Sequence, residues 1–489
     1  MGKNPFHSLS AKFTQLFLDG QADQSPLQPE TKEDTYQFIS AGGFHTAAIT
    51  KDGSLYTWGS NEYGQLGDGS QIDKNLPARM LKNVAAVSAG GFHTAAITKD
   101  GSLYTWGCNE FGQLGDGTNV NRLSPVRIMI NVFAVSAGFK HTMAITKDGT
   151  LYTWGCNQKN QIGPPTIILN LPSTKNMSEE QKEAIRNALY RNGTVARNEP
   201  ENWPKQPFNE CAAAVSAGNF HSTKLTSDGN AFAWGSDQYH QLGTKKSGSY
   251  GDPQFIMGGV TKIEAGGFHT AAITKDGSLY TWGNNQCGQL GRQTNEKRKM
   301  KPVKMMNNVI AVSAGSNHTA AITKDGSLYT WGNNLFGQLG DGTRVGRVEP
   351  KKILNHVTAV SAGARHTAAI LKNGSLLTWG DNQFGQLGDG TNNAATLPCQ
   401  IIRACETEVL NEIRKKDQYI LNLATKNNTD TPKYCTIYVV IQRSDDSLKS
   451  CEVAYVELPA NGRRRTEIKF PFPFEPGDIY KIATEYRNA

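Results

Sequence analysis

The chain has 489 residues and a formal net charge of +8, with 50 glycines and 8 tryptophans. A chain of this length usually forms two to four domains, although repeat proteins extend further as one unit. No apolar run approaches the ~18 residues of a transmembrane helix, and the N-terminus lacks the apolar core of a secretory signal. We therefore expect a soluble, cytoplasmic protein.

The positive charge is unevenly distributed. Residues 1–37 carry −2 and both 164–210 and 405–489 are neutral, so an excess of about +10 falls on the rest of the chain. That excess favours an acidic protein face, nucleic acid or an anionic membrane as a partner, and it is equally typical of a charge that only keeps the protein soluble. The 8 cysteines show no metal-type spacing, which indicates free thiols in a reducing compartment, apart from a Cys435–Cys451 bridge that the sequence leaves open.

Residues 1–37 form a polar segment that we expect to be flexible. Its apolar residues Leu9, Phe13, Leu16 and Phe17 fit a short amphipathic helix, which would dock on the remainder of the protein or touch a membrane surface. A peripheral membrane contact is therefore one interpretation of this segment.

A repeat of about 48 residues begins near Phe38 and recurs seven times. The segment Ala-Gly-Gly-Phe-His-Thr-Ala-Ala-Ile-Thr-Lys-Asp-Gly-Ser-Leu-Tyr-Thr-Trp-Gly starts identically at Ala41, Ala89 and Ala265. In every copy the repeat His precedes the repeat Trp by 13 residues. The repeat His residues are His45, His93, His141, His221, His269, His318 and His366, and the repeat Trp residues are Trp58, Trp106, Trp154, Trp234, Trp282, Trp331 and Trp379.

Each copy predicts a small antiparallel sheet. Residues 46–50 and 55–58 are two strand-like runs joined by Lys51-Asp52-Gly53, where Gly supplies the left-handed residue of a type I turn with a bulge. One such sheet cannot bury its own faces, whereas seven stacked radially can. We therefore predict an all-β, seven-bladed β-propeller over residues 38–403, with residues 37–39 and 399–402 sharing one blade to close the ring.

The repeat His and Trp residues are predicted to be structural. Each His recurs once per blade, so neighbouring imidazoles would lie too far apart to share one metal ion. We expect each His to be buried and bonded to backbone within its own blade, and each Trp to pack between blades. No catalytic constellation, cofactor site or metal site stands out in the sequence.

The third copy carries an insertion over residues 164–210. Ser178-Glu179-Glu180-Gln181 resembles a capping box, and the apolar residues that follow have helical spacing up to Asn192-Gly193. We expect a helix here, followed by coil around Trp203 and Phe208. The insertion is either decoration of the rim or a partner-binding protrusion held by a rigid scaffold.

The repeat ends before residue 405. Residues 405–489 predict a small antiparallel β domain, with a helix at 406–418 before five strands and turns at Asn461-Gly462 and residues 475–478. The run Arg463-Arg464-Arg465 beside a turn is typical of a solvated basic patch and less often of a contact for acidic lipid or protein.

Three motifs carry a family resemblance: Ala-Gly-x-x-His-(Thr/Ser), Asp-Gly-x-(Leu/Phe)-x-x-Trp-Gly and Gly-Gln-Leu-Gly. Together they resemble the regulator of chromosome condensation family, over residues 38–403. The resemblance implies a seven-bladed propeller like the founding member, which exchanges nucleotide on the small GTPase Ran. In its nearly identical copies and its extra tail, the chain resembles bacterial effectors that carry this repeat. Such effectors are secreted into a host cytosol and are thought to activate host Ran there.

Two functions from different classes follow. The first is a guanine-nucleotide exchange factor for Ran or a related GTPase, which must disturb the phosphate loop or the Mg²⁺ site. The resemblance implies that a short β-wedge projecting from a blade and acidic or polar loop residues do this. The second is a scaffold or inhibitor that binds a protein without exchange. We expect a monomer that binds no nucleic acid directly. The candidate partner contacts lie in the insertion and are Glu179, Glu180, Arg186, Tyr190, Arg191 and Trp203.

Overall fold

The structure is a computed structural model. It describes residues 35–164, 201–205, 211–244, 248–292, 298–401, 405–414, 419–427, 433–442, 448–458, 463–470 and 479–488. These residues form strands β1–β34 in two compact units, one spanning Asp34–Ile401 and the other containing the segment from Ile402 onward. Within these ranges, no helix has the length and hydropathy of a membrane-spanning segment.

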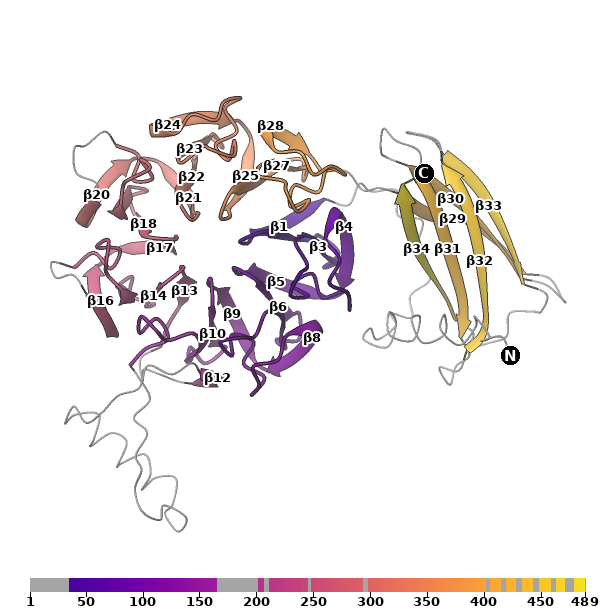
Figure 1. Cartoon of the computed structure of the whole chain (residues 1–489), viewed down its shortest axis with the longest axis horizontal. Helices are drawn as coiled ribbons and strands as arrows, with labels where there is room; N and C mark the ends of the chain where they lie inside the picture. Colours follow the sequence, from indigo (N-terminus) through magenta and orange to yellow (C-terminus); the bar gives the residue numbers. More distant parts are fainter. Residues whose placement is uncertain are drawn as a thin grey trace, which may run out of the picture. The chain divides into compact units, whose positions relative to one another are not determined.

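The first unit is a seven-bladed β-propeller (Figure 1). Each blade is one antiparallel sheet of four strands that follow one another in the chain. Blades 1 to 3 consist of β1 (Tyr36–Ala41), β2 (His45–Thr50), β3 (Leu55–Gly59), β4 (Lys74–Leu81); β5 (Val84–Ala89), β6 (His93–Thr98), β7 (Leu103–Gly107), β8 (Arg122–Met129); and β9 (Val132–Ala137), β10 (His141–Thr146), β11 (Leu151–Gly155), β12 (Glu201–Lys205).

The other four blades follow the same order. They consist of β13 (Ala214–Ala217), β14 (His221–Leu225), β15 (Ala231–Ser236), β16 (Ser249–Met257); β17 (Val260–Ala265), β18 (His269–Thr274), β19 (Leu279–Asn284), β20 (Arg298–Met306); β21 (Val309–Ala314), β22 (His318–Thr323), β23 (Leu328–Gly332), β24 (Arg347–Leu354); and β25 (Val357–Ala362), β26 (His366–Leu371), β27 (Leu376–Gly380), β28 (Ala395–Gln400). Figure 1 shows the first strand of each blade nearest the middle of the ring and the fourth at its rim.

Small and apolar side chains explain why the blades stack. In the second strand of blade 1, His-Thr-Ala-Ala-Ile-Thr, every residue is buried, because both faces of the sheet meet a neighbouring blade. Trp106 illustrates the interface: it packs in one cluster with Ala47 and Leu55 of the preceding blade and is fully buried. Its indole Nε1 donates to the Gln65 carbonyl oxygen at 2.9 Å, so its polar atom is also satisfied.

The ring closes differently from the prediction. Residues 37–39 lie in β1 of blade 1 and residues 399–400 in β28 of blade 7, so the two ends of the propeller do not share a blade. They meet as neighbours instead, with the Tyr36 N–H donating to the Gly374 carbonyl at 3.0 Å and the Ala41 N–H to Ser361 Oγ at 2.9 Å. Each sequence repeat therefore forms one complete blade, since the propeller begins with an innermost strand and ends with an outermost strand.

The two ends of the blades form two distinct faces of the ring. We call the face with the Lys-Asp-Gly turns and the connections between blades the turn face. The opposite face, here the loop face, carries the loops before each repeat His and those between third and fourth strands. Neighbouring loops interlock there, since the Gly43 N–H donates to the Gly90 carbonyl and a Cβ at Gly90 would lie 2.6 Å from the Gly138 carbonyl oxygen.

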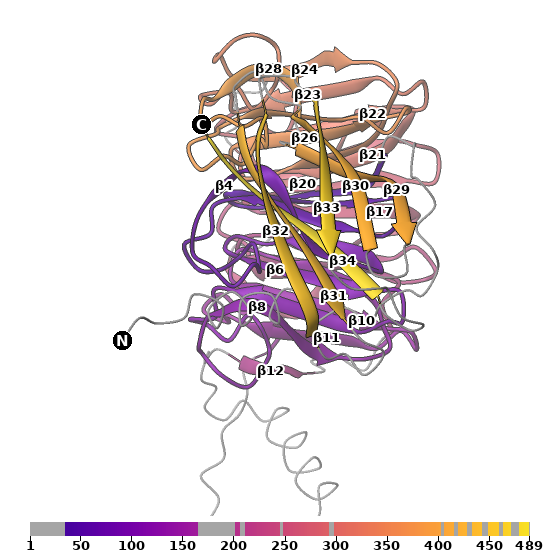
Figure 2. The same ribbon diagram turned by 90° about the vertical axis from the view of Figure 1, so that its right-hand side faces the viewer.

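The C-terminal segment forms two three-stranded sheets, in the orders β29-β30-β33 and β32-β31-β34 (Figure 2). The strands are β29 (Cys405–Arg414), β30 (Tyr419–Asn427), β31 (Lys433–Gln442), β32 (Leu448–Leu458), β33 (Arg463–Phe470) and β34 (Ile479–Asn488). All pairs are antiparallel, as predicted. Ile420 and Leu423 of β30 and Ile468 of β33 are buried.

One prediction for this segment was wrong, and one possibility that the sequence left open is excluded. Residues 405–414 form β29 and not the start of a helix, because pairing with β30 outweighs a weak local helical pattern. The Cys435–Cys451 bridge is excluded by register. Cys435 pairs with Val456 and Cys451 with Val440, an offset that separates the two cysteines by roughly 16 Å along the strands, far beyond disulfide reach.

Candidate partner-binding face

The repeat His residues form a closed belt of hydrogen bonds around the ring. Each Nε2 lies 2.8–2.9 Å from the hydroxyl that follows the repeat His of the next blade. The pairs are His45–Thr94, His93–Thr142, His141–Ser222, His221–Thr270, His269–Thr319, His318–Thr367 and His366–Thr46. The expected bond to backbone within one blade is therefore wrong; the bond crosses to the next blade.

The direction of these bonds is fixed by a third group. The Thr94 hydroxyl donates its single hydrogen to the Gln65 carbonyl oxygen at 2.8 Å, so His45 Nε2 must be the donor of the bond between them. Burial lowers the pKa of His45 to about 3 and that of His366 to about 4, which keeps the imidazoles neutral at pH 7. The belt is therefore framework. No group of three His, Cys, Asp or Glu suited to a metal occurs among the described residues.

The residue just before each repeat His lies on the loop face, next to the belt. In blades 1, 2, 4 and 5 it is phenylalanine: Phe44, Phe92, Phe220 and Phe268. Lys140, Asn317 and Arg365 take this place in the other three blades. All seven are only partly buried, except Arg365, which is exposed. The framework thus holds a ring of aromatic and cationic side chains at the surface.

The aromatic side chains of neighbouring blades contact one another. Phe92 has its ring centroid 5.6 Å from Phe44, 5.4 Å from Tyr63 and 5.3 Å from Phe139. Phe44 in turn lies 5.6 Å from Phe384 of blade 7. The distances suit aromatic pairs, so the cluster is a continuous surface from blade 7 to blade 3. A second cluster joins Phe220, Phe268 and Tyr239 in blades 4 and 5.

Cations lie over the edge of this surface. Lys140 Nζ lies 4.1 Å from the centroid of Phe111, and the Arg365 guanidinium lies 4.6 Å from that of Phe336. Such contacts hold a positive charge on an apolar platform. Leu335, 65% exposed, and Val120, 60% exposed, extend the apolar area outward. A partly apolar, aromatic patch with paired cations is typical of a protein-binding surface.

Buried amides hold the loops that carry these aromatics. The Asn61 side chain accepts from the Leu66 N–H at 2.9 Å and donates to Asp68 at 3.0 Å. Blade 4 has Asp237 in this place, where it accepts from the Leu242 N–H and the Thr244 hydroxyl. Burial raises the pKa of Asp237 to about 6, whereas burial lowers the pKa of the neighbouring His240.

Asp237→Asn is expected to stabilise the protein above pH 6. A folded-state pKa raised from 3.8 to about 6 means that ionisation opposes folding, a cost that begins near pH 4 and is complete above pH 6. Asparagine, which six other blades use here, should remove it and raise the free energy of unfolding by on the order of 1 kcal/mol at pH 8. Urea unfolding at pH 8 and pH 4 checks this: a gain at pH 4 as large as at pH 8 would contradict the ionisation argument.

The insertion is anchored on the loop face. Glu201 pairs with Gly155 at the loop-face end of β11, and the Gly117 N–H of blade 2 donates to the Asn202 carbonyl at 2.8 Å. Residues 201–205, expected to be coil, form the outer strand β12 of blade 3. Trp203 lies in that strand, whereas Glu179, Glu180, Arg186, Tyr190 and Arg191 lie outside the described residues, as does the predicted helix.

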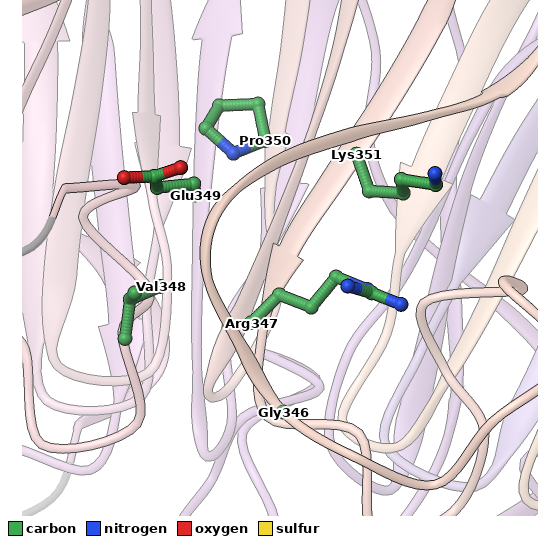
Figure 3. A pocket seen from close by; sticks show the side chains of 6 residues that line it. All are labelled: Gly346, Arg347, Val348, Glu349, Pro350 and Lys351. Atoms are coloured by element: carbon green, nitrogen blue, oxygen red, sulfur yellow. The ribbon is translucent and has the colours of Figure 1, made fainter.

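A shallow pocket of about 470 Å³ lies at the start of β24 (Figure 3). Six consecutive residues line it, from Gly346 to Lys351. Arg347 Nε already donates to the Asp341 carboxylate, so the nearest guanidinium is neutralised by the protein itself. We therefore place the candidate site on the aromatic surface and not in this pocket.

The sequence profile of the RCC1-like domain family matches residues 10–353 and 129–428, which together span most of the chain. The chain belongs to the RCC1-like domain family. The structure resembles human WBSCR16 with a TM-score of 0.61 at 20% identity, over 73% of this chain and 96% of that one. It also resembles Prp20p of Saccharomyces cerevisiae, studied with its binding to Gsp1p and histones, with a TM-score of 0.59 at 22% identity, over 73% and 90% of the two chains.

Curated relatives match over single repeats. The plant ultraviolet-B receptor UVR8 of Arabidopsis thaliana is 48% identical over 44 residues, 9% of this chain and 10% of that protein. Ras guanine nucleotide exchange factor C of Dictyostelium discoideum is 46% identical over 46 residues, 9% of this chain and 3% of that protein. The aligned part thus spans a tenth or less of these relatives' length, and the likeness concerns the repeat and its fold.

Sequence reasoning missed the aromatic surface. The motif Ala-Gly-x-x-His leaves the residue before the repeat His undefined, and no role was predicted for it, although it is Phe, Lys, Asn or Arg in different copies. That variation at an otherwise constant motif was the available signal. Only the ring geometry shows that residues 48 apart in sequence, such as Phe44 and Phe92, lie in contact.

Proposed function

We propose that this RCC1-like propeller binds a small GTPase on its loop face and promotes release of the bound guanine nucleotide. The observation that carries the proposal is the aromatic surface centred on Phe92, which lies on the same face of the ring as the anchored residues 201–202. A rigid ring with an exposed apolar patch fits the recognition of a protein surface, and Ran is the first GTPase to test given the family.

Exchange has an electrostatic requirement. A factor speeds nucleotide release by binding the nucleotide-free GTPase more tightly than the loaded form, and linkage makes the two ligands weaken each other. Carboxylates serve this purpose, since they repel phosphates and compete for Mg²⁺ and for the phosphate-loop lysine. Glu62 and Glu110 are exposed at the loop tips of blades 1 and 2, and both raise the pKa of Tyr63 after the larger effect of desolvation. This pair borders the aromatic surface.

Release of fluorescent GDP from Ran and from a panel of small GTPases tests the proposal. The full chain should accelerate release on the order of tenfold or more on one member. Glu62→Gln with Glu110→Gln should cut that acceleration roughly tenfold, while a matched pair on the turn face, Asp100→Asn with Asp148→Asn, should not. No acceleration on any GTPase would contradict exchange.

A deletion of residues 165–200 separates the contribution of the insertion. The deletion must spare 201–205, because these residues are the outer strand of blade 3. If exchange persists at the same rate, the insertion is not the active element. If a GTPase binds and its nucleotide stays, the propeller is a scaffold or inhibitor that uses the same face without exchange.

A further inference from the structure

The turn face carries a ring of lysines that the loop-face function does not use. The first residue of the turn between second and third strands is lysine in six of the seven blades, and Ser227 takes its place in blade 4. The six are Lys51, Lys99, Lys147, Lys275, Lys324 and Lys372. All are exposed, and within the described part of the chain none pairs with a carboxylate.

Further cations reach the same face from the outer strands. Arg79, Arg127, Lys304 and Lys352 each pair across the ladder with the tyrosine of the third strand in blades 1, 2, 5 and 6. Lys304 lies near enough to the turn of blade 5 to help lower the pKa of Asp276 to about 2, after the larger effects of hydrogen bonds from Thr274 and Ser278. All four outer-strand cations are exposed.

The aspartate carboxylates of this face accept hydrogen bonds from residues of their own turns. Asp100 accepts from the Ser102 N–H at 3.0 Å and from the Ser102 hydroxyl at 3.0 Å, and the same pattern holds Asp276 and Asp325. Ten exposed basic side chains, the six turn lysines and the four outer-strand cations, stand against six aspartates on the turn face. The surface is therefore net positive.

Exposed apolar side chains stand among these lysines. The Lys147 N–H donates to the Asn131 carbonyl at 2.8 Å, which places the blade 3 turn beside Ile130 and Phe133, 60% and 64% exposed. In blade 6 the Lys324 N–H donates to the Asn308 carbonyl at 2.8 Å, next to Ile310, 42% exposed. Lysines around exposed apolar residues are a combination found on proteins that lie on a membrane surface.

We propose that the turn face binds an anionic lipid bilayer, with the lysines at the headgroups and Phe133, Ile130 and Ile310 entering the interfacial region. A lysine side chain carries a point charge at the end of a flexible stem, which suits the diffuse layer of lipid headgroups. Nucleic acid fits less well, because the apolar side chains would then face phosphates. The loop face lies at the other end of the blades, so a membrane-bound propeller keeps it open to a protein partner.

Co-sedimentation of the full chain with vesicles tests the proposal. We expect binding to phosphatidylcholine vesicles with about 30 mol% phosphatidylserine, little binding to phosphatidylcholine alone, and weakening as salt rises and shortens the Debye length. The triple variant Lys99→Glu, Lys147→Glu and Lys324→Glu should lower the partition coefficient on the order of 100-fold, given the attraction of each lysine to anionic lipid.

A matched triple variant controls for total charge. Lys159→Glu, Lys301→Glu and Arg344→Glu change the net charge equally, but these residues lie on the loop face or the rim, so vesicle binding should fall much less. Melting temperatures of both variants confirm folding. Equal losses in the two variants, absence of binding to anionic vesicles, or binding of a DNA duplex in preference to vesicles would each overturn the proposal.

A separate variant tests the contribution of the apolar side chains to vesicle binding. Phe133→Ser with Ile310→Ser should weaken vesicle binding about tenfold while leaving its salt dependence unchanged, because the lysines remain. An unchanged partition coefficient would show that these apolar residues do not enter the bilayer, which would contradict that part of the proposal.

Discussion

Phe92→Ala should weaken binding of the proposed GTPase partner by roughly 30-fold or more, equivalent to about 2 kcal/mol. Phe92 is the centre of the aromatic surface, since it contacts Phe44, Tyr63 and Phe139 of three different segments. Its removal takes away both direct contact area and the support of its neighbours. Isothermal titration calorimetry or surface plasmon resonance with the nucleotide-free GTPase gives the change in Kd directly.

The matched control is Phe133→Ala, the same substitution on the turn face, where the side chain is 64% exposed. It should leave the Kd for the GTPase unchanged. Phe92 is half-buried, so its replacement also costs some stability, and the melting temperature must be followed alongside the Kd. A lower melting temperature with an unchanged Kd would show that the cluster only joins blades.

Trp106→Ala is expected to cost about 3–5 kcal/mol of the free energy of unfolding. The side chain is fully buried between blades 1 and 2 and packs against Val84, Ala89 and Ala96 as well as the preceding blade. Its loss opens a large cavity that small neighbours such as alanine cannot fill. Urea denaturation followed by circular dichroism measures the effect as a shift in the midpoint.

Trp106→Phe separates packing from hydrogen bonding. Phenylalanine keeps most of the apolar volume and loses the bond to the Gln65 carbonyl, which still accepts from the Thr94 hydroxyl at 2.8 Å. The cost should therefore be well below that of alanine, about 1–2 kcal/mol. Phe255→Ala on the outer strand, where the ring is 59% exposed, should cost less than about 1 kcal/mol. Equal costs for Ala and Phe at residue 106 would mean that the indole N–H, not the packing, dominates.

The blades could be predicted because their interactions are local. The spacing of 13 residues between repeat His and Trp is one hairpin, in which His45 pairs with Gly59 and Thr46 with Trp58. The turn between them needs only Lys51-Asp52-Gly53, with Gly53 at a φ of +89°. Each of these patterns spans only a few consecutive residues, so seven copies of them predict seven small sheets.

Contacts between copies could not be predicted in the same way. The bond between Thr46 and His366 joins residues 320 apart, and no local pattern distinguishes it from a bond within the blade. The ends of the ring and the strand at 405–414 were predicted wrongly for the same reason, because their partners are set by tertiary pairing. The aromatic surface depends on the same geometry, since its members come from different repeats.

The number of blades, the identity of each turn and the residues that must be buried follow from the amino-acid order alone. They do so because hydrophobic alternation and turn chemistry act over a few residues. Which side chains meet across blades, and which gather on each face, depends on how the blades pack around the ring. Radial stacking brings equivalent positions of successive repeats together, so a single phenylalanine or lysine per repeat becomes a continuous aromatic surface on one face and a basic ring on the other.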